Sequence, residues 1–299
     1  MEPIQASMKP SLVILLFTCL WLHGCGESTI SRDEQAHSLH KYLDFKERDD
    51  QLTGGIRMIP ISTPKGEFKV WTKRVGNNPR MKLLLLHGGP GATHEVFHCF
   101  DGYFPVEGIE YIYYDQLGSY FSDQPSDTTL WTIDRFVDEV EQVRLALGLD
   151  PDNFYLLGQS WGGVLAMEYA LKHQDKLKGL VISNMMASGP EYTRYVKEVL
   201  GPQMQPSVLS EVMDIEDRGD FSNPRYMELL MEHFYTEHLL RFPVEEWPQS
   251  VNMAFRHMNP EVYVYMQGPS EFGLVGDVVL KDWDVKAELS GIAVPTLVI

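Results

Sequence analysis

Four short apolar runs constrain the fold of this 299-residue chain more than any other feature. The runs are KLLLLH, IEYIYYD, FYLLG and KGLVISN, at residues 82–87, 109–115, 154–158 and 178–184. A strand that is buried on both faces has no polar side, so runs of this kind are typical of a parallel sheet covered by helices. Their alternation with helical stretches predicts an α/β fold with a mainly parallel sheet.

Two of the intervening stretches carry helical patterns. In residues 134–148, apolar side chains recur every three or four positions, which places them on one face of a helix. Thr132 and Gly148 are residue types that begin and end such a helix. The stretch GGVLAMEYALKH at 162–173 predicts a second helix, and FKVWTKRV at 68–75 alternates like a further strand.

The pattern changes after residue 186. Residues 187–276 are helical in pattern and rich in Met and aromatic side chains. The stretch VVLKDWDVKAELSGIAVPTLVI, from residue 278 onward, returns to a strand pattern, and VPTLVI resembles another core strand. We therefore expect a helical cap inserted into the α/β core after the strand at 178–184. The expected segments are a signal peptide (1–25), a polar tether (26–53), the first part of the core (54–186), the cap (187–276) and the resumed core (277–299).

Residues 1–25 have the features of an export signal. Lys9 precedes an apolar run of about a dozen residues, shorter than the roughly 20 that a membrane-spanning helix needs. LHGC, which ends at Cys25, resembles the lipobox of bacterial lipoproteins, although His23 replaces a small residue. That resemblance implies lipidation of Cys25, and Gly26 favours the outer membrane. We expect an exported lipoprotein that contacts the membrane only through its lipid anchor; the alternative is a soluble periplasmic or secreted protein.

Charge and cysteine content exclude several classes of function. The chain has 42 acidic and 25 basic residues, a net charge of -17, which argues against nucleic acid as a partner. Of its three cysteines, Cys19 and Cys25 lie in the export signal, so Cys99 has no partner for an intrachain disulfide in the body of the protein. No zinc-type spacing is present. The sequence therefore implies no metal and no cofactor.

The motif GQSWG places Ser160 between a predicted strand and a predicted helix. In that context G-x-S-x-G is the signature of a nucleophile on a tight turn, and the pattern alone would be weak. The amide of Trp161 would face the developing oxyanion, and the following helix adds its N-terminal dipole. We therefore predict that Ser160 is a catalytic nucleophile; the alternative is a structural turn serine.

The motif HGGPG, residues 87–91, follows the strand at 82–87. Glycines and a proline at a strand end form a stiff loop that a ligand can approach closely. We expect the Gly89 amide to be the second oxyanion donor, within a loop that also contains Gly88, Pro90 and Gly91. A cis bond before Pro90 would suit this loop. His87 is interpreted as an anchor of the loop and not as the catalytic base.

Together, HGGPG, YYDQLGS and GQSWGG resemble the proline iminopeptidase family of α/β-hydrolases, in the same order along the chain. Residues 267–284 are similar to the end of the cap in tricorn-interacting aminopeptidases of that family. The resemblance implies an α/β-hydrolase fold, a short peptide as substrate, and binding of its free amino group by Glu271. Without it, Glu271 would be a solvated glutamate. Tyr120 stands where the family often has glycine.

The composition of the cap agrees with a substrate that carries a free amine. Residues 188–280 contain 15 acidic and 6 basic residues, which would attract peptide N-termini. Solubility is the simpler explanation for this charge. The aromatic residues Phe234, Tyr235, Trp247, Phe255, Tyr263 and Tyr265 are candidates to line a pocket, but we expect most of them to pack between cap helices.

The triad order Ser, Asp or Glu, His predicts an acidic residue and a histidine late in the chain. None of the ten histidines lies there, and His94, His98, His233, His238 and His257 are all poorly placed. We expect the missing pair to lie beyond residue 299 and the 299-residue form to be inactive. The leading interpretation is a serine aminopeptidase that releases N-terminal proline. The alternatives are an esterase or amidase on small substrates, and a non-catalytic binding protein.

Overall fold

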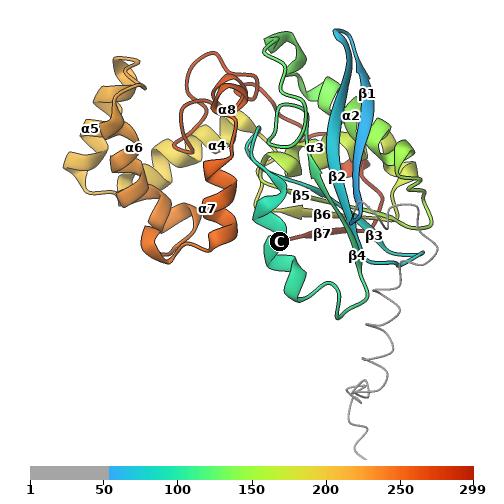
Figure 1. The fold of residues 1–299 in the computed structure, drawn as a ribbon. Helices are drawn as coiled ribbons and strands as arrows, with labels where there is room; N and C mark the ends of the chain where they lie inside the picture. The colour runs from blue at the N-terminus through green and yellow to red at the C-terminus, as the bar shows by residue number, and fades with distance from the viewer. Residues whose placement is uncertain (1–53) are drawn as a thin grey trace, which may run out of the picture.

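A computed structural model describes residues 54–299 of the protein (Figure 1). The expected signal peptide, the lipobox with Cys25 and the polar tether lie outside the described residues. In the described part, a sheet with its own helices forms one side of the molecule, and α4 to α8 gather on the other side (Figure 1).

Seven strands form one sheet in the order β1-β2-β4-β3-β5-β6-β7. β1 and β2 form an antiparallel hairpin, and β2 pairs antiparallel with β4, whereas all other neighbours are parallel. The predicted α/β fold with a mainly parallel sheet is therefore confirmed. The strands are β1 (Ile56–Thr63), β2 (Gly66–Val75), β3 (Lys82–Leu86), β4 (Glu110–Asp115), β5 (Phe154–Gln159), β6 (Gly179–Ser183) and β7 (Thr296–Val298).

The helices fall into two groups. In the core, α2 packs against β1, and α3 packs against β3, β5 and β6. These core helices are α2 (Ile133–Ala146) and α3 (Trp161–His173), with the 3-10 helices η1 (His94–Gly102), η2 (Thr128–Leu130), η3 (Gln174–Lys176) and η8 (Leu289–Gly291). The cap helices are α4 (Gly189–Tyr195), α5 (Pro206–Asp217), α6 (Pro224–Leu230), α7 (Gln249–Arg256) and α8 (Pro260–Met266), the π-helices η4 (Val196–Leu200) and η6 (Met231–Leu239), and the 3-10 helices η5 (Gly201–Gln203) and η7 (Val244–Glu246).

Most of the predicted elements are present. The four apolar runs are β3, β4, β5 and β6, and the two predicted core helices are α2 and α3. Thr132 caps α2, because its side chain accepts a hydrogen bond from the Arg135 N–H. Gly148 follows the end of α2 with a φ of 63°, a left-handed conformation that glycine adopts without strain.

Three features differ from the prediction. The hairpin strand β1 was missed, although its residues alternate between exposed and buried. Residues 277–295 were expected to return to strands, but they form turns, η8 and a single bridge between Ser188 and Asp284. The predicted strand near the end of the chain is β7, which pairs with β6, yet Leu297, Val298 and Ile299 are exposed, because β7 is the edge strand of the described sheet.

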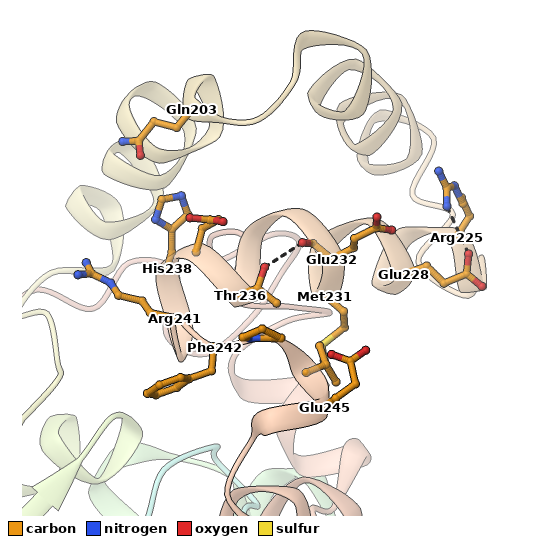
Figure 2. A pocket seen from close by; sticks show the side chains of 13 residues that line it. Gln203, Arg225, Glu228, Met231, Glu232, Thr236, His238, Arg241, Phe242 and Glu245 are labelled. Carbon is orange, nitrogen blue, oxygen red and sulfur yellow. Dashed lines mark hydrogen bonds and ion pairs between the residues drawn. The ribbon is translucent and has the colours of Figure 1, made fainter.

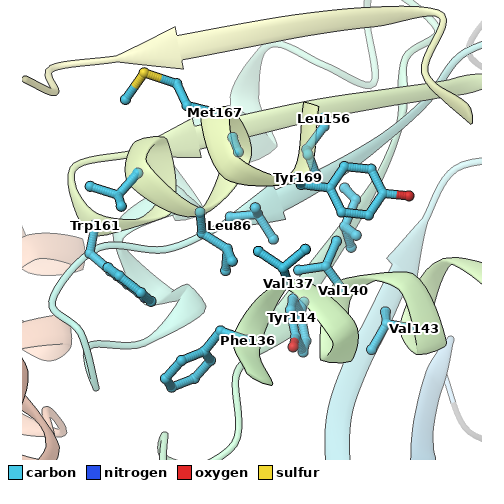
Figure 3. Packing of buried hydrophobic residues seen from close by; sticks show 14 of the residues in the cluster. Leu86, Tyr114, Phe136, Val137, Val140, Val143, Leu156, Trp161, Met167 and Tyr169 are labelled. Carbon is cyan, nitrogen blue, oxygen red and sulfur yellow. The ribbon is translucent and has the colours of Figure 1, made fainter. Parts of the chain in front are cut away.

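The first turns of α3 belong to the largest buried cluster of the described residues (Figure 3). All residues from 161 to 167 are buried, and the indole of Trp161 meets the ring of Phe136 edge-on, with centroids 5.3 Å apart. Leu86, at the end of β3, belongs to the same cluster. Truncating a buried aromatic side chain of this kind costs about 3–5 kcal/mol of folding stability. Tight packing therefore holds the residues after Ser160 in place.

The cap has a hydrophobic core of its own. Val196, Val212, Leu229, Leu230 and Phe272 are fully buried in a cluster separate from that of the sheet. Many of its turns are π or 3-10 rather than α, and π-turns often occur at functional sites. Among the described helices, none is long and apolar enough to cross a membrane.

Candidate active site

Ser160 occupies a strained turn between β5 and α3. Its φ of 54° and ψ of −126° are unusual for a residue with a side chain. The Ser160 N–H donates to the Ser183 carbonyl at 3.0 Å, and its own carbonyl accepts from the Gly163 N–H at 2.6 Å. The surrounding hydrogen bonds therefore hold the strained conformation in place.

Glycines flank Ser160 because the backbone passes too close for side chains. A Cβ at Gly158 would lie 2.0 Å from the Gly162 carbonyl oxygen. A Cβ at Gly162 would lie 2.0 Å from the Leu86 carbonyl oxygen, so it would collide with β3. The G-x-S-x-G spacing is therefore required by the packing of α3 against the end of β3.

The HGGPG loop lies directly beside Ser160. A Cβ at Gly88 would approach the Ser160 Cβ to 3.0 Å, and the peptide bond before Pro90 is cis, as anticipated. Gly89 has a φ of 105°, which a side chain would strain. Within residues 54–299, neither the Gly89 N–H nor the Trp161 N–H donates a hydrogen bond. Both amides are available to an oxygen bound next to Ser160.

His87 is buried and tied to the backbone on both sides. Its Nδ1 lies 2.9 Å from the Gly88 carbonyl oxygen, and its Nε2 accepts from the Gln116 N–H at 3.1 Å. This pattern requires a proton on Nδ1 alone. Burial lowers the pKa of His87, which also favours the neutral ring. Both nitrogens are therefore occupied by the fold.

Gln116 connects the two halves of this region, and the sequence analysis did not single it out. Its side-chain amide donates to the His87 carbonyl at 3.1 Å, and its Oε1 accepts from the Trp161 indole N–H at 2.7 Å. Gln116 belongs to the YYDQLGS block, so its place in a motif was the available signal. One side chain thus bridges the HGGPG loop and the start of α3.

Glu271 forms hydrogen bonds with residues of three cap elements, α4, η6 and α8. Its Oε1 accepts from the Tyr263 hydroxyl at 2.7 Å. The Tyr192 hydroxyl lies 2.7 Å from the Glu271 carbonyl oxygen and 3.3 Å from Oε2, and the Gln267 amide lies 3.4 Å from Oε2. The Glu271 N–H donates to the Tyr235 hydroxyl oxygen at 2.9 Å. Burial raises the pKa of Glu271, while the two tyrosine hydroxyls oppose that shift. Among the described residues, no cation pairs with this carboxylate.

A cavity of about 630 Å³ lies between core and cap and joins Ser160 to Glu271. Gly88 and Gly89 line it from the core, and Glu271 is the only carboxylate among the described residues that line it. The lining contains neither lysine nor arginine. Burial lowers the pKa of His238, which favours the neutral form of this lining histidine. The cavity therefore presents a single carboxyl group, and no lysine or arginine among the described residues faces it.

The aromatic residues of the cap contribute more to this cavity than expected. Phe234, Trp247, Phe255 and Tyr263 line it, while Phe234, Tyr235 and Trp247 also pack in the buried cluster of the cap. Three of these four, Phe234, Trp247 and Tyr263, are also buried. Tyr192 was missed entirely, since nothing in its sequence context marks it as a partner of Glu271.

The described histidines have partners elsewhere. Within residues 54–299, no hydrogen bond joins a histidine to the Ser160 hydroxyl. The contacts in place are His94 with Asp115 at 2.9 Å, His257 with Glu95 at 2.7 Å, His98 against the rings of His94 and Tyr113, His173 against Tyr169, His233 with Glu232 at 3.7 Å, and His238 against Phe234.

Tyr120 belongs to the core and contacts the cap through His257. It has a φ of 26°, a strained value for a residue with a side chain, and its ring stacks on His257 with centroids 4.2 Å apart. Cys99 lies exposed on η1, away from this stack. Within residues 54–299, no group of three or more His, Cys, Asp or Glu side chains is arranged to hold a metal ion.

A strained serine between a parallel strand and a helix, beside a glycine-rich loop, is the geometry of an α/β-hydrolase. A family model for the alpha/beta hydrolase fold matches residues 82–252. Proline iminopeptidase of Flavobacterium johnsoniae is 62% identical over 242 residues, which cover 81% of this chain and 80% of that protein. The Elizabethkingia meningoseptica proline iminopeptidase is 59% identical over the same shares. The chain therefore belongs to the proline iminopeptidase family of α/β-hydrolases.

Solved structures agree with this assignment. The crystal structure of Mycobacterium smegmatis proline iminopeptidase superimposes with a TM-score of 0.70 at 31% identity, covering 81% of this chain and 80% of that one. The structure of VinJ superimposes with a TM-score of 0.72 at 30% identity over the same shares. Membership of this family supports a hydrolase of the peptidase type.

Proposed function

We propose that the protein is a serine aminopeptidase that releases N-terminal proline from short peptides. Ser160 attacks the carbonyl carbon of the first peptide bond and forms an acyl-enzyme, and the amides of Gly89 and Trp161 stabilise the oxyanion. Glu271 binds the free amino group. The proposal rests chiefly on one observation, that Ser160 and Glu271 line the same cavity.

The surroundings of Glu271 support recognition of an ammonium group. Its donors are tyrosine hydroxyls and an amide, which orient the carboxylate without neutralising it. A charge-assisted hydrogen bond is stronger where water is excluded, and an incoming ammonium would relieve the cost of burying this carboxylate. A peptide blocked at its N-terminus would leave that cost in place. The arrangement therefore favours an exopeptidase over an endopeptidase.

The proton acceptor for Ser160 is a separate part of the proposal. None of the described histidines is hydrogen-bonded to Ser160, and His87 has both nitrogens occupied. In this fold the acidic residue and the histidine follow the nucleophile in the chain. We propose that both lie after Ile299 and that the 299-residue polypeptide is inactive. Turnover of a prolyl-arylamide by that polypeptide, abolished by Ser160→Ala, would contradict this part alone.

The function is tested on the full-length gene product with a prolyl-arylamide and a short acyl ester. Ser160→Ala should reduce the turnover of the prolyl substrate by at least about 10⁴-fold, since the covalent step is lost. Glu271→Gln should reduce kcat/KM for the prolyl substrate by about 10²-fold, because a buried charge pair typically contributes about 2–5 kcal/mol. Glu246→Gln, at an exposed cap glutamate that lines neither pocket, is the matched control and should leave both activities unchanged.

The result of these assays separates the alternatives. An esterase or amidase on small substrates would cleave the ester faster and would not depend on Glu271. A non-catalytic binding protein would show no turnover of either substrate while still binding peptides. Either pattern would overturn the aminopeptidase proposal.

We also propose that the protein is exported and anchored through a lipid on Cys25. The proposal rests on the apolar run after Lys9 and on the LHGC motif. Cys25→Ser should move the protein from the membrane fraction to the soluble periplasmic fraction. Unchanged fractionation of Cys25→Ser would contradict the anchor, and retention in the cytoplasm of the parent would contradict export.

A further inference from the structure

Three large apolar side chains that line the catalytic cavity have little packing around them. Leu239, Phe242 and Phe255 are 42%, 51% and 42% exposed, and all three face the cavity of Ser160 and Glu271. They come from two cap elements, the end of η6 with the residues after it, and α7. Apolar surface left open to solvent inside a concave site is typical of a binding surface for an apolar group.

The oxyanion loop, η1 and α7 contribute only uncharged residues to the lining of this cavity. Ala92 follows Gly91 in that loop, and Ala92 and Val96 line the cavity. α7 packs against η1, which contains Val96, and presents Val251, Ala254 and Phe255 to the same cavity. The residues that line the cavity from the oxyanion loop, η1 and α7 are therefore all apolar.

The position of Glu271 indicates which part of a peptide meets this wall. Its partners Tyr192, Tyr263 and Gln267 lie on α4 and α8 or at the end of α8, whereas the exposed apolar residues lie on η6 and α7. The first residue of a peptide would be held at its amine by Glu271 and at its carbonyl beside Ser160. A cavity of about 630 Å³ has space for more than that one residue.

The uncharged lining of the catalytic cavity lies next to a charged pocket on the outside of the cap. His238 and Phe242 line the catalytic cavity and also a separate outer pocket on the cap (Figure 2). Around that outer pocket stand the charged side chains of Arg225, Glu228, Glu232, Glu237, Arg241 and Glu245. The inner cavity contains no such groups apart from Glu271. His238 and Phe242 thus divide an uncharged inner space from a charged outer one.

We propose that Leu239, Phe242 and Phe255 form a subsite for an apolar side chain on the second residue of the peptide, immediately after the scissile bond. The proposal rests on the proposed function, since it assumes that the first residue lies between Glu271 and Ser160. The substrate class is a peptide whose second residue is apolar and uncharged, with its later residues directed toward the charged outer pocket. A free carboxylate on the second residue is disfavoured, because the inner wall offers it no cation.

Equilibrium binding tests this without depending on turnover. The Ser160→Ala variant is titrated with the amides Pro-Leu, Pro-Gly, Pro-Lys and Pro-Glu, and with the free acid of Pro-Leu. Pro-Leu-amide should bind about tenfold more tightly than Pro-Gly-amide, the effect expected for burying a leucine side chain. The lysine, glutamate and free-acid ligands should bind more weakly than Pro-Leu-amide. Equal affinity across the series would overturn the subsite.

Variants test whether the leucine-to-glycine preference arises from the proposed subsite. In the Ser160→Ala background, Phe242→Ala and Phe255→Ala should each reduce the leucine-to-glycine preference by at least threefold. Both side chains are about half exposed, so these variants are expected to fold. Tyr195→Ala removes a ring that is 54% exposed on the cap but lies outside the cavity, and it should leave the preference unchanged. An unchanged preference in both phenylalanine variants would overturn the assignment.

Two further ligands separate failure of the subsite from failure of the proposed function. N-acetyl-Pro-Leu-amide should bind much more weakly than Pro-Leu-amide if Glu271 recognises the amine. Equal affinity of these two contradicts the proposed function and leaves the leucine-to-glycine comparison valid. Ala-Leu-amide and Ala-Gly-amide should show the same preference as the prolyl pair, and a preference that follows only the first residue would overturn the subsite.

Discussion

The core and the cap build their parts of the site in different ways. In the core, backbone geometry positions Ser160, because Gly158 and Gly162 let β3, β5 and α3 approach within distances that exclude a Cβ. In the cap, side-chain hydroxyls position Glu271 from α4, α8 and η6. The core part depends on local motifs, whereas the cap part depends on residues up to 79 positions apart. This difference explains why short sequence motifs reveal the surroundings of Ser160 but not the partners of Glu271.

The largest loss of stability is expected at Gly162, where the core has no space for a side chain. Gly162→Ala should destabilise the protein by at least about 4 kcal/mol, because its Cβ would collide with the Leu86 carbonyl of β3. Gly102→Ala is the control, since a Cβ there meets nothing within 4 Å, and it should stay within about 0.5 kcal/mol. Urea unfolding measures both. Similar stability of the two variants would show that the turn at Ser160 tolerates a side chain at position 162.

The stability of the cap should instead depend strongly on an ion pair whose carboxylate is largely buried. Lys197 on η4 pairs with Glu216 on α5, and its Nζ lies 3.9 Å from the centroid of the Phe272 ring, next to Glu271. Lys197→Met should cost about 3 kcal/mol, because it leaves Glu216 buried without a cation. Hydrogen exchange should increase in α5 and η4 and remain unchanged in β5 and α3.

The matched control removes the second charge as well. The double variant Lys197→Met/Glu216→Gln keeps an acceptor for the Tyr226 hydroxyl, which donates to Glu216 at 2.8 Å. It should recover most of the lost stability. A double variant no more stable than Lys197→Met would show that packing of the lysine stem, and not charge, is what matters.

A smaller effect is expected at the junction of the two regions. Asn259 caps α8 by accepting from the N–H groups of Glu261 and Val262, and its amide donates to the Gly118 carbonyl of the core at 2.9 Å. Asn259→Ala should cost about 2 kcal/mol and weaken peptide binding, since α8 carries Tyr263. Asn223→Ala, which removes a cap of α6 inside the cap, should cost about 1 kcal/mol and leave binding unchanged. Equal effects on binding would contradict this role of Asn259.

The smallest effect concerns the charge on Glu271. Burial raises the pKa of Glu271 in the folded protein above its ordinary value of 4.5, so the folded state holds the proton more tightly than the unfolded chain. The resulting stabilisation is complete below the unfolded pKa and is lost as the pH rises through the folded pKa. Glu271→Gln should therefore be slightly more stable than the parent at pH 7, and this advantage should vanish below about pH 4. Thermal unfolding across pH 3–8 checks this, with Glu245→Gln as the control for an exposed carboxylate.

The sequence by itself determined the alternation of buried strands and helices, the elbow at Ser160 and the HGGPG loop. These features follow from local rules: apolar runs bury both faces of a strand, and only glycine permits the backbone approach at Gly158 and Gly162. It left β1 unrecognised and misassigned residues 277–295, where turn geometry and not hydrophobic pattern decides the conformation. The tertiary structure alone decided that Tyr192 and Tyr263 hold Glu271, that Gln116 joins Trp161 to the loop at His87, and that Phe242 and Phe255 face the cavity of Ser160. The physical reason is that such contacts join residues far apart in the chain, and their partners are set by how the cap helices pack on the sheet.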